Sequence, residues 1–573
     1  MRSKIAPIII PILIGIAAFL VVYGITPLDV TNDRWIIAGY DEYDIVQHYL
    51  GWVGFRQSDW AFPLGFTPNI DVANGTIISF TDSIPWLAII FKLFRGILPK
   101  TFQYLGLYAL LCYILQSIAA FRIIHFKTKN ITYSALGTLL FSFAPIMLER
   151  MMRHTALASH WFILFSILIW MKNREKYSVR NYVYYLILML LSIGIHPYFL
   201  PMIAGFMTLS FIEDIHRKRY ITGAFFIGNP LLTYIAGRII GVVGGDVGAS
   251  RDGFGYYSMN INAPINPTSI GGYDWSSFMK IHPQTLGNYD GFNYLGAGIV
   301  IGIIITVILS LIFFDKKTIS SYLKERILFI LLLVCFTLFA ISNVPTLNGR
   351  ELFEVPLPSK ILYLCGIFRA SSRLFYPVYY CIYLFVILIL YKLKDHLQTK
   401  YIYGIIIFIV LIQLYDLHIC LIEKHAKMRE NADFVSILDD KGVYDVLENN
   451  TNILIDRYSG NKLIVGVAGL NHNDMLCYFI ANSGDYSKSM EYSNEILDRI
   501  KQTGNIESYV IVTTDMNCLS EFLEHENIGY YEIYGNYFIC DVNSSEYVRH
   551  PKSAKSSKEY IGDHRKNSRS SQI

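Results

Sequence analysis

Long apolar runs constrain the fold more than any other feature of this sequence. A helix needs about 20 mostly apolar residues to cross the hydrocarbon core of a bilayer. Hydrophobic residues make up 53% of the 573-residue chain and charged residues only 16%. We therefore expect an α-helical polytopic membrane protein with about eleven transmembrane helices, at approximately 5–25, 103–124, 131–147, 157–171, 181–195, 198–213, 221–243, 295–314, 326–342, 375–392 and 401–420.

The net charge of +4 does not indicate a nucleic-acid partner. The basic residues lie in short clusters between apolar runs, where they orient a membrane protein. The first run follows Arg2 and Lys4 and lacks a small-residue cleavage site. We therefore expect a retained helix and a cytoplasmic N-terminus.

The segment 83–99 decides the topology. Its apolar run is interrupted by Lys92, Arg95 and Gly96. If it crossed the membrane, most basic clusters would lie outside the cell; if it stays on the outer surface as an interfacial or re-entrant helix, six clusters face the cytoplasm. The second arrangement is favoured. It places one set of segments in a single external compartment: 26–102, 148–156, 196–197, 244–294, 343–374 and everything after 421.

The composition becomes water-soluble after His418. We expect a transmembrane domain over 1–420, a small extracytoplasmic α/β domain over 421–548 and a disordered, basic tail over 549–573. Within the second domain, alternating apolar residues predict strands and one apolar stripe predicts a helix. The strands are expected at 452–456, 462–467, 509–512 and 530–540, and the helix at 492–502.

Three polar clusters with helical spacing lie in the predicted external loops. They are Asp41, Asp44 and His48 with Gln47 beside them; Arg150, Arg153 and His154; and Arg369 with Arg373. Transfer of a sugar from a lipid phosphate needs a carboxylate that accepts the proton of an acceptor hydroxyl. It also needs cationic groups that hold the departing phosphate.

Other interpretations of these residues stay open. The acids could be solvated residues paired with Arg34 or Arg56, and the arginines could extend toward lipid headgroups. Asp82 could cap the helix that follows it, and His196 could mark a tight turn. The aromatic and amide side chains of 244–294 suit a sugar, but they equally suit a packed cap over the helices.

Several motifs together resemble a known group of proteins. They are Asp44–Trp52 (DIVQHYLGW), Trp60–Gly65 (WAFPLG), Thr81–Pro85 (TDSIP), His196–Phe199 (HPYF) and Gly291–Gly296 (GFNYLG). Over roughly 1–420 the chain resembles an incompletely characterised family of bacterial membrane proteins that looks like a branch of the GT-C glycosyltransferase superfamily.

The resemblance implies a transferase that uses a polyprenyl-phosphate-linked sugar and has a catalytic acid in its first external loop. Asp44 is the expected base, with Asp41 as the alternative. The segment 369–377 resembles an arginine-containing motif that would bind lipid phosphate or pyrophosphate. The loop has no Asp-x-Asp, which leaves a divalent cation open.

Taken together, the sequence predicts a glycosyltransferase of the bacterial cytoplasmic membrane whose acceptor is an envelope polysaccharide, glycolipid or other molecule on the outer face. A transporter or flippase of lipid-linked glycans and an inactive scaffold are the alternatives. The residues expected to bind substrate are Gln47, His48, Trp52, Asp82, Arg150, Arg153, His154, His196, Asn293, Tyr294, Arg369 and Arg373.

Overall fold

The computed structural model describes residues 2–40, 44–244, 253–448, 450–455, 462–471, 476–478, 487–533 and 535–542. These residues form two compact units. Unit 1 comprises the described residues of Met1–Asp29, Leu105–Ala236 and Arg251–Arg429. Unit 2 comprises those of Val30–Tyr104, Gly237–Ser250 and Glu430–Ile573.

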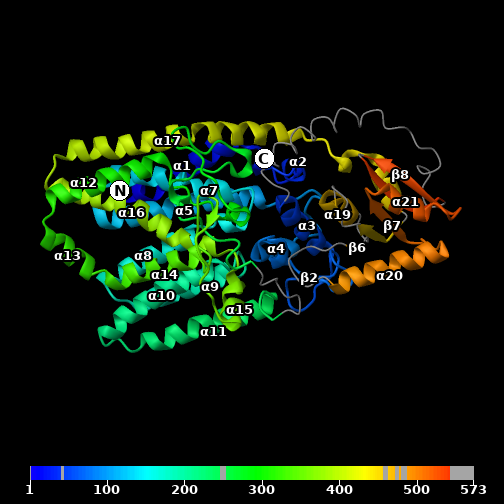
Figure 1. The fold of residues 1–573 in the computed structure, drawn as a ribbon, viewed down its shortest axis with the longest axis horizontal. Coiled ribbons are helices and arrows are strands. Elements are labelled where there is room, and N and C mark those ends of the chain that lie inside the picture. The colour runs from blue at the N-terminus through cyan, green and yellow to red at the C-terminus, as the bar shows by residue number, and fades with distance from the viewer. Residues whose placement is uncertain are drawn as a thin grey trace. The chain divides into compact units, whose positions relative to one another are not determined.

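Unit 1 is built from helices (Figure 1). They are α1 (Arg2–Tyr23), α5 (Leu105–Thr128), α6 (Ile131–Ser142), α7 (Pro145–Arg150), α8 (Trp161–Glu175), α9 (Val179–Ile193), α10 (Phe199–His216), α11 (Thr222–Ile240), whose end enters unit 2, α12 (Ala297–Phe313), α13 (Lys316–Lys324), α14 (Ile327–Ile341), α15 (Ser359–Cys365), α16 (Tyr376–Lys392) and α17 (Thr399–Glu430). Strands β3 (Thr346–Leu347) and β4 (Arg350–Glu351) form a small hairpin.

Among the described residues, six helical segments are long and apolar enough to cross a membrane: Ile5–Tyr23, Leu105–Thr128, Thr155–Glu175, Thr222–Ile240, Ser371–Asp395 and Thr399–Asp439. The number is seven if α12 and α13, bent by 120°, form one span. The chain is therefore a helical membrane protein, but the expected count of eleven is wrong. The other apolar runs also form helices, of which α6, α9 and α14 have only 12, 15 and 15 residues.

Asp416 of α17 fixes the start of α12. Its Oδ2 accepts hydrogen bonds from the backbone nitrogen of Ala297, at 2.8 Å, and from the hydroxyl of Tyr294, at 2.7 Å. Nitrogens in the first turn of a helix have no partner within the helix, so a carboxylate stabilises them. This contact anchors the segment 291–296, which leads into the candidate site.

Unit 2 combines short helices with a mixed sheet. Its elements are α2 (Arg34–Ile37), α3 (Asp44–Gln57), β1 (Phe66–Thr67), β2 (Thr76–Ile77), α4 (Pro85–Lys92), α18 (Lys441–Glu448), β5 (Asn452–Ile455), α19 (Lys462–Asn471), β6 (Leu476–Tyr478), α20 (Ser487–Thr503), β7 (Tyr509–Thr513), α21 (Met516–Phe522), β8 (Ile528–Ile533) and β9 (Asn536–Asp541). The strand order is β6-β5-β7-β9-β8. Strands β6, β5 and β7 are parallel, and β9 runs antiparallel to β7 and β8.

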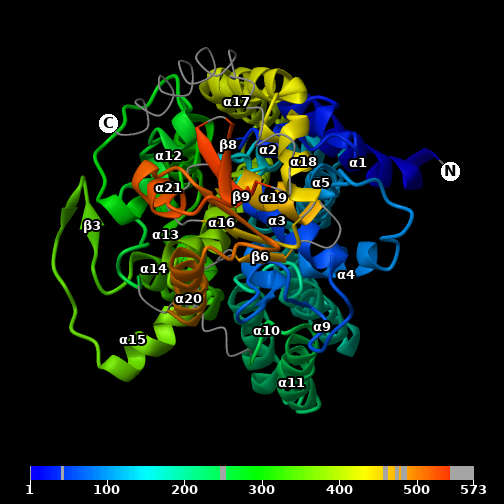
Figure 2. The ribbon, with the colours of Figure 1, turned by 90° about the vertical axis from the view of Figure 1, so that its right-hand side faces the viewer.

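Helices cover both faces of this sheet. On one face, Ile500 of α20 and Phe522 of α21 share a buried core with Ile511 of β7. Helix α19 lies on the opposite face (Figure 2) and packs against α3. The sheet thus belongs to the same compact unit as residues 30–104, whereas the sequence grouped those residues with the transmembrane domain.

The predicted strand at 462–467 is wrong, because these residues begin helix α19. The helix is buried along most of its length, from Ile464 to Asn471. A short run that is apolar all round has neither the period of a strand nor that of an amphipathic helix. The predicted tail, 549–573, lies outside the described residues.

Candidate functional site

Asp290 is the centre of a buried charge cluster in unit 1. It lies in the short 3-10 helix η6 (Leu286–Gly291). Its Oδ1 is 3.0 Å from Nη2 of Arg373 and 3.0 Å from Nη1 of Arg150. Its Oδ2 accepts a hydrogen bond from Nε of Arg373 at 3.1 Å. Arg373 therefore binds the carboxylate through two nitrogens, in the fork geometry that a guanidinium group favours.

Glu149 extends the cluster on the other side of Arg150. Its Oε2 lies 2.9 Å from Nε of Arg150, and its Oε1 pairs with Nη1 of Arg153. The side chain of Arg150 is 0% exposed and that of Glu149 is 2% exposed. The cluster holds three guanidinium groups against two carboxylates, so it carries one excess positive charge.

Four segments that are distant in sequence meet around this cluster. They are α7, the turn before α10, η6, and the 3-10 helix η8 (Ser371–Phe375). The hydroxyl of Ser372 donates to the backbone oxygen of Asp290 at 3.1 Å. The hydroxyl of Tyr198 accepts from the backbone nitrogen of Ala370 at 2.9 Å. These bonds join η8 to η6 and to the turn before α10.

Local sequence explains two of these segments. Helix α7 begins at Pro145, whose missing N–H costs nothing at the first helical position, and it ends at Arg150, where a cation suits the helix dipole. Before η6, Thr285 and Asn288 form a capping box, which satisfies nitrogens that the helix leaves unpaired. Arg150 and Asp290 are thus presented from short helical segments.

The charges fix the protonation of the cluster. Burial alone would raise the pKa of Asp290, but the guanidinium groups of Arg150 and Arg373 outweigh burial and lower it. Burial and the positive charges of Arg150, Arg153 and Arg373 hold the pKa of His154 well below its usual range. At neutral pH the carboxylate is therefore ionised and His154 is neutral.

The predicted arginines differ in how freely they could meet a ligand. Arg150 is enclosed by its partners. Arg373 is 14% exposed, and its guanidinium lies 4.7 Å from the ring centre of Tyr198. Arg369 is partly exposed and lies 5.6 Å from the ring centre of Tyr257. Among the described residues no carboxylate pairs with Arg369. Arg369 and Arg373 are thus the better candidates for an anionic ligand.

The other predicted residues of unit 1 support the fold around the cluster. His196 accepts a hydrogen bond from the backbone nitrogen of Tyr198 at 3.3 Å, as expected of a turn residue. Asn293 is buried and donates to the backbone oxygen of Gly291 at 3.2 Å. Tyr294 is also buried and bonds to Asp416, as described above.

In unit 2, the two motifs at 44–52 and 81–85 pack together. Ser83 donates to the backbone oxygen of His48 at 2.6 Å, and its hydroxyl lies 2.7 Å from that of Thr81. A Cβ atom built on Gly51 would lie 1.9 Å from Oγ1 of Thr81. Only glycine therefore allows this approach of α3 to the turn.

This packing places the predicted residues of unit 2. Asp44 is the first residue of α3 and is half-buried; Gln47 is also half-buried. Trp52 is buried and donates from Nε1 to the backbone oxygen of Phe102 at 2.8 Å. Asp41 lies outside the described residues.

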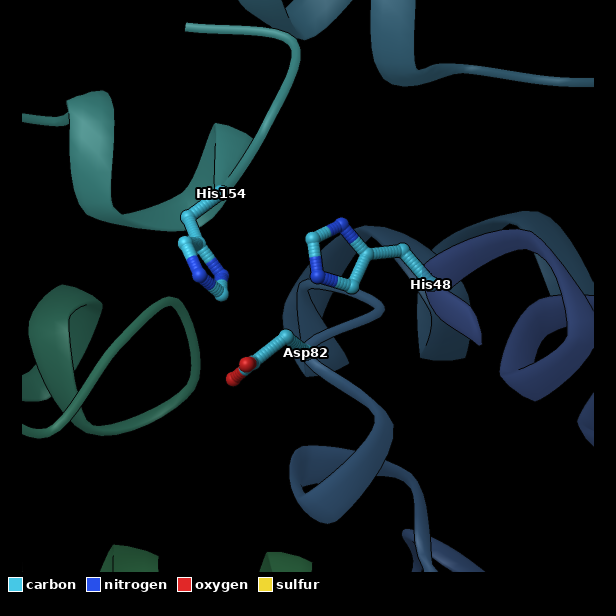
Figure 3. Close-up of side chains that lie close together, drawn as sticks. All are labelled: His48, Asp82 and His154. Atoms are coloured by element: carbon cyan, nitrogen blue, oxygen red, sulfur yellow. The ribbon is translucent and has the colours of Figure 1, made fainter. Parts of the chain in front are cut away.

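Asp82 does not cap α4 as expected. It follows the 3-10 helix η2 (Ile78–Thr81) with a left-handed backbone, φ 54°, and the residue at the N-cap of α4 is Ile84. Figure 3 shows the side chains of Asp82 and His48 close together. Their ligand atoms lie within 4.8 Å of each other. Two such groups could contribute to a cation site, but a zinc ion usually takes three or four protein ligands. His154, also labelled in Figure 3, belongs to unit 1.

Sequence reasoning missed the two carboxylates that organise the arginines. Asp290 lies between Tyr289 and Gly291 in a polar loop, and Glu149 directly precedes Arg150. A charge next to an apolar run is costly unless it is paired. This cost implies that Arg150 needs a nearby carboxylate, and the adjacent Glu149 could have been predicted as its partner on that ground. The pairing of Asp290 with Arg373 spans 83 residues and had no local signal.

Comparison with known proteins gives one family. Residues 12–418 match the domain of unknown function DUF6311. No curated protein matches the chain.

Proposed function

We propose that this chain, which belongs to the DUF6311 family, transfers a sugar from a polyprenyl-phosphate-linked donor to an acceptor of the cell envelope. The acceptor would be a polysaccharide, glycolipid or other molecule on the outer face of the bacterial cytoplasmic membrane. The proposal includes a GT-C type of enzyme, a cytoplasmic N-terminus and an extracytoplasmic C-terminal region.

One observation carries the proposal: the arginine cluster around Asp290 in a membrane protein. Asp290 and Glu149 hold Arg150 and Arg153 in place, while Arg373 keeps part of its surface exposed. The cluster has an excess positive charge, and Arg369 adds another on the same 369–373 segment. Guanidinium groups bind phosphate well, because it accepts charge-assisted hydrogen bonds from them.

In the proposed reaction, an oxygen of the acceptor hydroxyl forms a bond to the anomeric carbon of the sugar. The bond from that carbon to the lipid phosphate oxygen breaks, and polyprenyl phosphate leaves. Arg369 and Arg373 would stabilise the negative charge that the leaving phosphate gains. A carboxylate accepts the proton of the hydroxyl. Asp44 of unit 2, on the motif at 44–52, is the proposed base.

Binding of the lipid phosphate is the first test. Native mass spectrometry of the purified protein with polyprenyl phosphate is expected to show a complex that weakens at least tenfold in Arg373→Gln. Arg326→Gln is the matched control, because Arg326 is a partly exposed arginine of unit 1 that pairs with Glu325. Equal binding by parent, Arg373→Gln and Arg369→Gln proteins would argue against the phosphate site.

Binding alone does not separate a transferase from a flippase, because both hold a lipid phosphate. Asp44→Asn provides the distinction. The variant is expected to bind polyprenyl phosphate as the parent does and to lose sugar transfer, since an amide cannot accept the proton. Asp59→Asn is the control, because Asp59 is a fully exposed acid of unit 2. Undiminished transfer by Asp44→Asn would remove Asp44 from the mechanism.

A further inference from the structure

Helix α4 in unit 2 has apolar side chains on both of its faces. The inner face packs on the protein: Ala88 is buried, and the ring of Phe91 stacks on that of Tyr104 with centres 5.3 Å apart. The outer face continues into the turns after Lys92, where Ile97 donates from its backbone nitrogen to Phe94 at 3.0 Å. A surface helix of a soluble protein normally turns polar residues outward.

The outer face carries a continuous apolar stripe. Ile90 lies on α4, and Leu93, Phe94 and Ile97 lie in the turns that follow it, with the spacing i, i+3, i+4 and i+7. They are 48%, 67%, 50% and 82% exposed. Single exposed apolar residues are ordinary, but four large ones within residues 90–97 indicate a surface that contacts another apolar phase.

The basic residues of the same segment turn away from the stripe. Lys92 is buried; its Nζ donates to Oγ of Ser58 at 3.0 Å and lies 3.9 Å from the ring centre of Phe55. Arg95 donates from Nη1 to the backbone oxygen of Ser58 at 2.6 Å and is partly exposed. The charges that interrupt the apolar run in the sequence are therefore satisfied by the protein and do not oppose burial of the stripe.

The segment is too short to cross a bilayer. The eight residues of α4 extend about 12 Å at 1.5 Å per residue, against about 30 Å of hydrocarbon. A short helix with an apolar outer face and basic residues at its edge fits the boundary between lipid headgroups and acyl chains. There, the exposed Lys100 could reach lipid phosphates.

We propose that the stripe Ile90, Leu93, Phe94 and Ile97 inserts into the headgroup boundary of a lipid bilayer and anchors unit 2 to the membrane surface. The described part of the chain has six helical segments able to cross a membrane, so a bilayer is its environment and lipid is the partner within reach. This inference does not depend on glycosyl transfer and would hold for a transporter or a scaffold.

The test uses the full-length protein in lipid nanodiscs. A bimane fluorophore is attached at Ile97→Cys in a cysteine-depleted background, and its quenching by doxyl-labelled lipids is measured. Glu524→Cys is the control, because Glu524 is an exposed residue of unit 2 after α21. The expected result is at least twofold stronger quenching at position 97 than at 524, and stronger quenching by 5-doxyl than by 16-doxyl lipid.

Three outcomes would overturn the proposal. Equal, weak quenching at 97 and 524 would place the stripe in water or against protein. Stronger quenching by 16-doxyl lipid would place it in the middle of the bilayer. Disulfide cross-linking of two copies through Ile97→Cys, without lipid quenching, would make a second copy the partner of the stripe. Leu93→Cys is measured in the same way, because a second position of the stripe shows whether the result at position 97 comes from a local disturbance by the label.

Discussion

Asp290 accepts two hydrogen bonds from Arg373, from Nε at 3.1 Å and from Nη2 at 3.0 Å. The same carboxylate lies 3.0 Å from Nη1 of Arg150. It thus ties α7 to η8. Arg150 also donates from Nε to the hydroxyl of Tyr376, directly after η8, at 2.9 Å. A paired carboxylate in this position stabilises the fold chiefly because its removal would leave buried positive charges without a partner.

Replacing Asp290 with Asn should destabilise unit 1 strongly. The amide keeps the shape but leaves three guanidinium groups with one carboxylate, which costs about 3–5 kcal/mol for a buried pair. The expected readout is a large fall in the thermal midpoint of the detergent-solubilised protein. Asp274→Asn, at an exposed position in the same loop, should change the midpoint little. Similar midpoints for both variants would contradict a stabilising role of the pair.

Gly51→Ala should destabilise unit 2. An alanine inside a helix is normally favoured over glycine by up to about 1 kcal/mol, but here the new Cβ would lie 1.9 Å from Oγ1 of Thr81. Overpacking of this kind costs about 1–3 kcal/mol. Gly96→Ala, where the new atom meets nothing within 4 Å, is the matched control. Limited proteolysis should cleave unit 2 faster in Gly51→Ala; equal cleavage rates would show that the turn at 81–83 can move aside.

Asp33 should make the stability of unit 2 depend on pH. Burial raises its pKa from 3.8 to about 6, although Tyr49 donates a hydrogen bond to it at 2.9 Å. Because the folded state binds this proton more tightly than the unfolded chain, its stabilisation is present below about pH 4 and is lost as the pH rises through about 6. The full difference is about 3 kcal/mol.

Asp33→Asn removes this dependence, because an amide does not titrate and can still accept from Tyr49. The variant should be more stable than the parent at pH 8, and the difference should shrink steadily at pH 6 and pH 5. Thermal midpoints at the three pH values measure it. Asp59→Asn, at a fully exposed position, should show no such trend. A constant difference between Asp33→Asn and the parent across this range would refute the titration.

Length and apolarity were enough to predict the class of the protein, because the energy of crossing a bilayer dominates local preferences. They did not give the number of spans. Helices such as α9 have the composition of a membrane span, but its 15 residues are fewer than the about 20 needed to cross the hydrocarbon core. The helix α19 was mistaken for a strand because contacts with both the sheet and α3 made it apolar all round.

The candidate site could be predicted in part. Helical spacing grouped Arg150 with Arg153 and Arg369 with Arg373, but α7 ends at Arg150 and Arg369 precedes η8, so neither pair shares a helix. Spacing could not identify Asp290, because its partners Arg150 and Arg373 are distant in sequence and are brought to it only by the tertiary fold. Trp52, which was expected to bind substrate, donates a hydrogen bond to the backbone oxygen of Phe102, a contact that the sequence motif gave no means to predict.

The proposed activity is tested most directly by the purified chain in liposomes with radiolabelled polyprenyl-phosphate sugars and an envelope extract as acceptor. We expect label in the acceptor fraction with the parent protein and with Arg326→Gln. We expect at least a hundredfold less with Asp44→Asn and Arg373→Lys, because the first lacks the base and the second lacks the guanidinium group proposed to stabilise the leaving phosphate. Transfer at the parent rate by both of these variants, or none by the parent with any donor, would contradict the proposed activity.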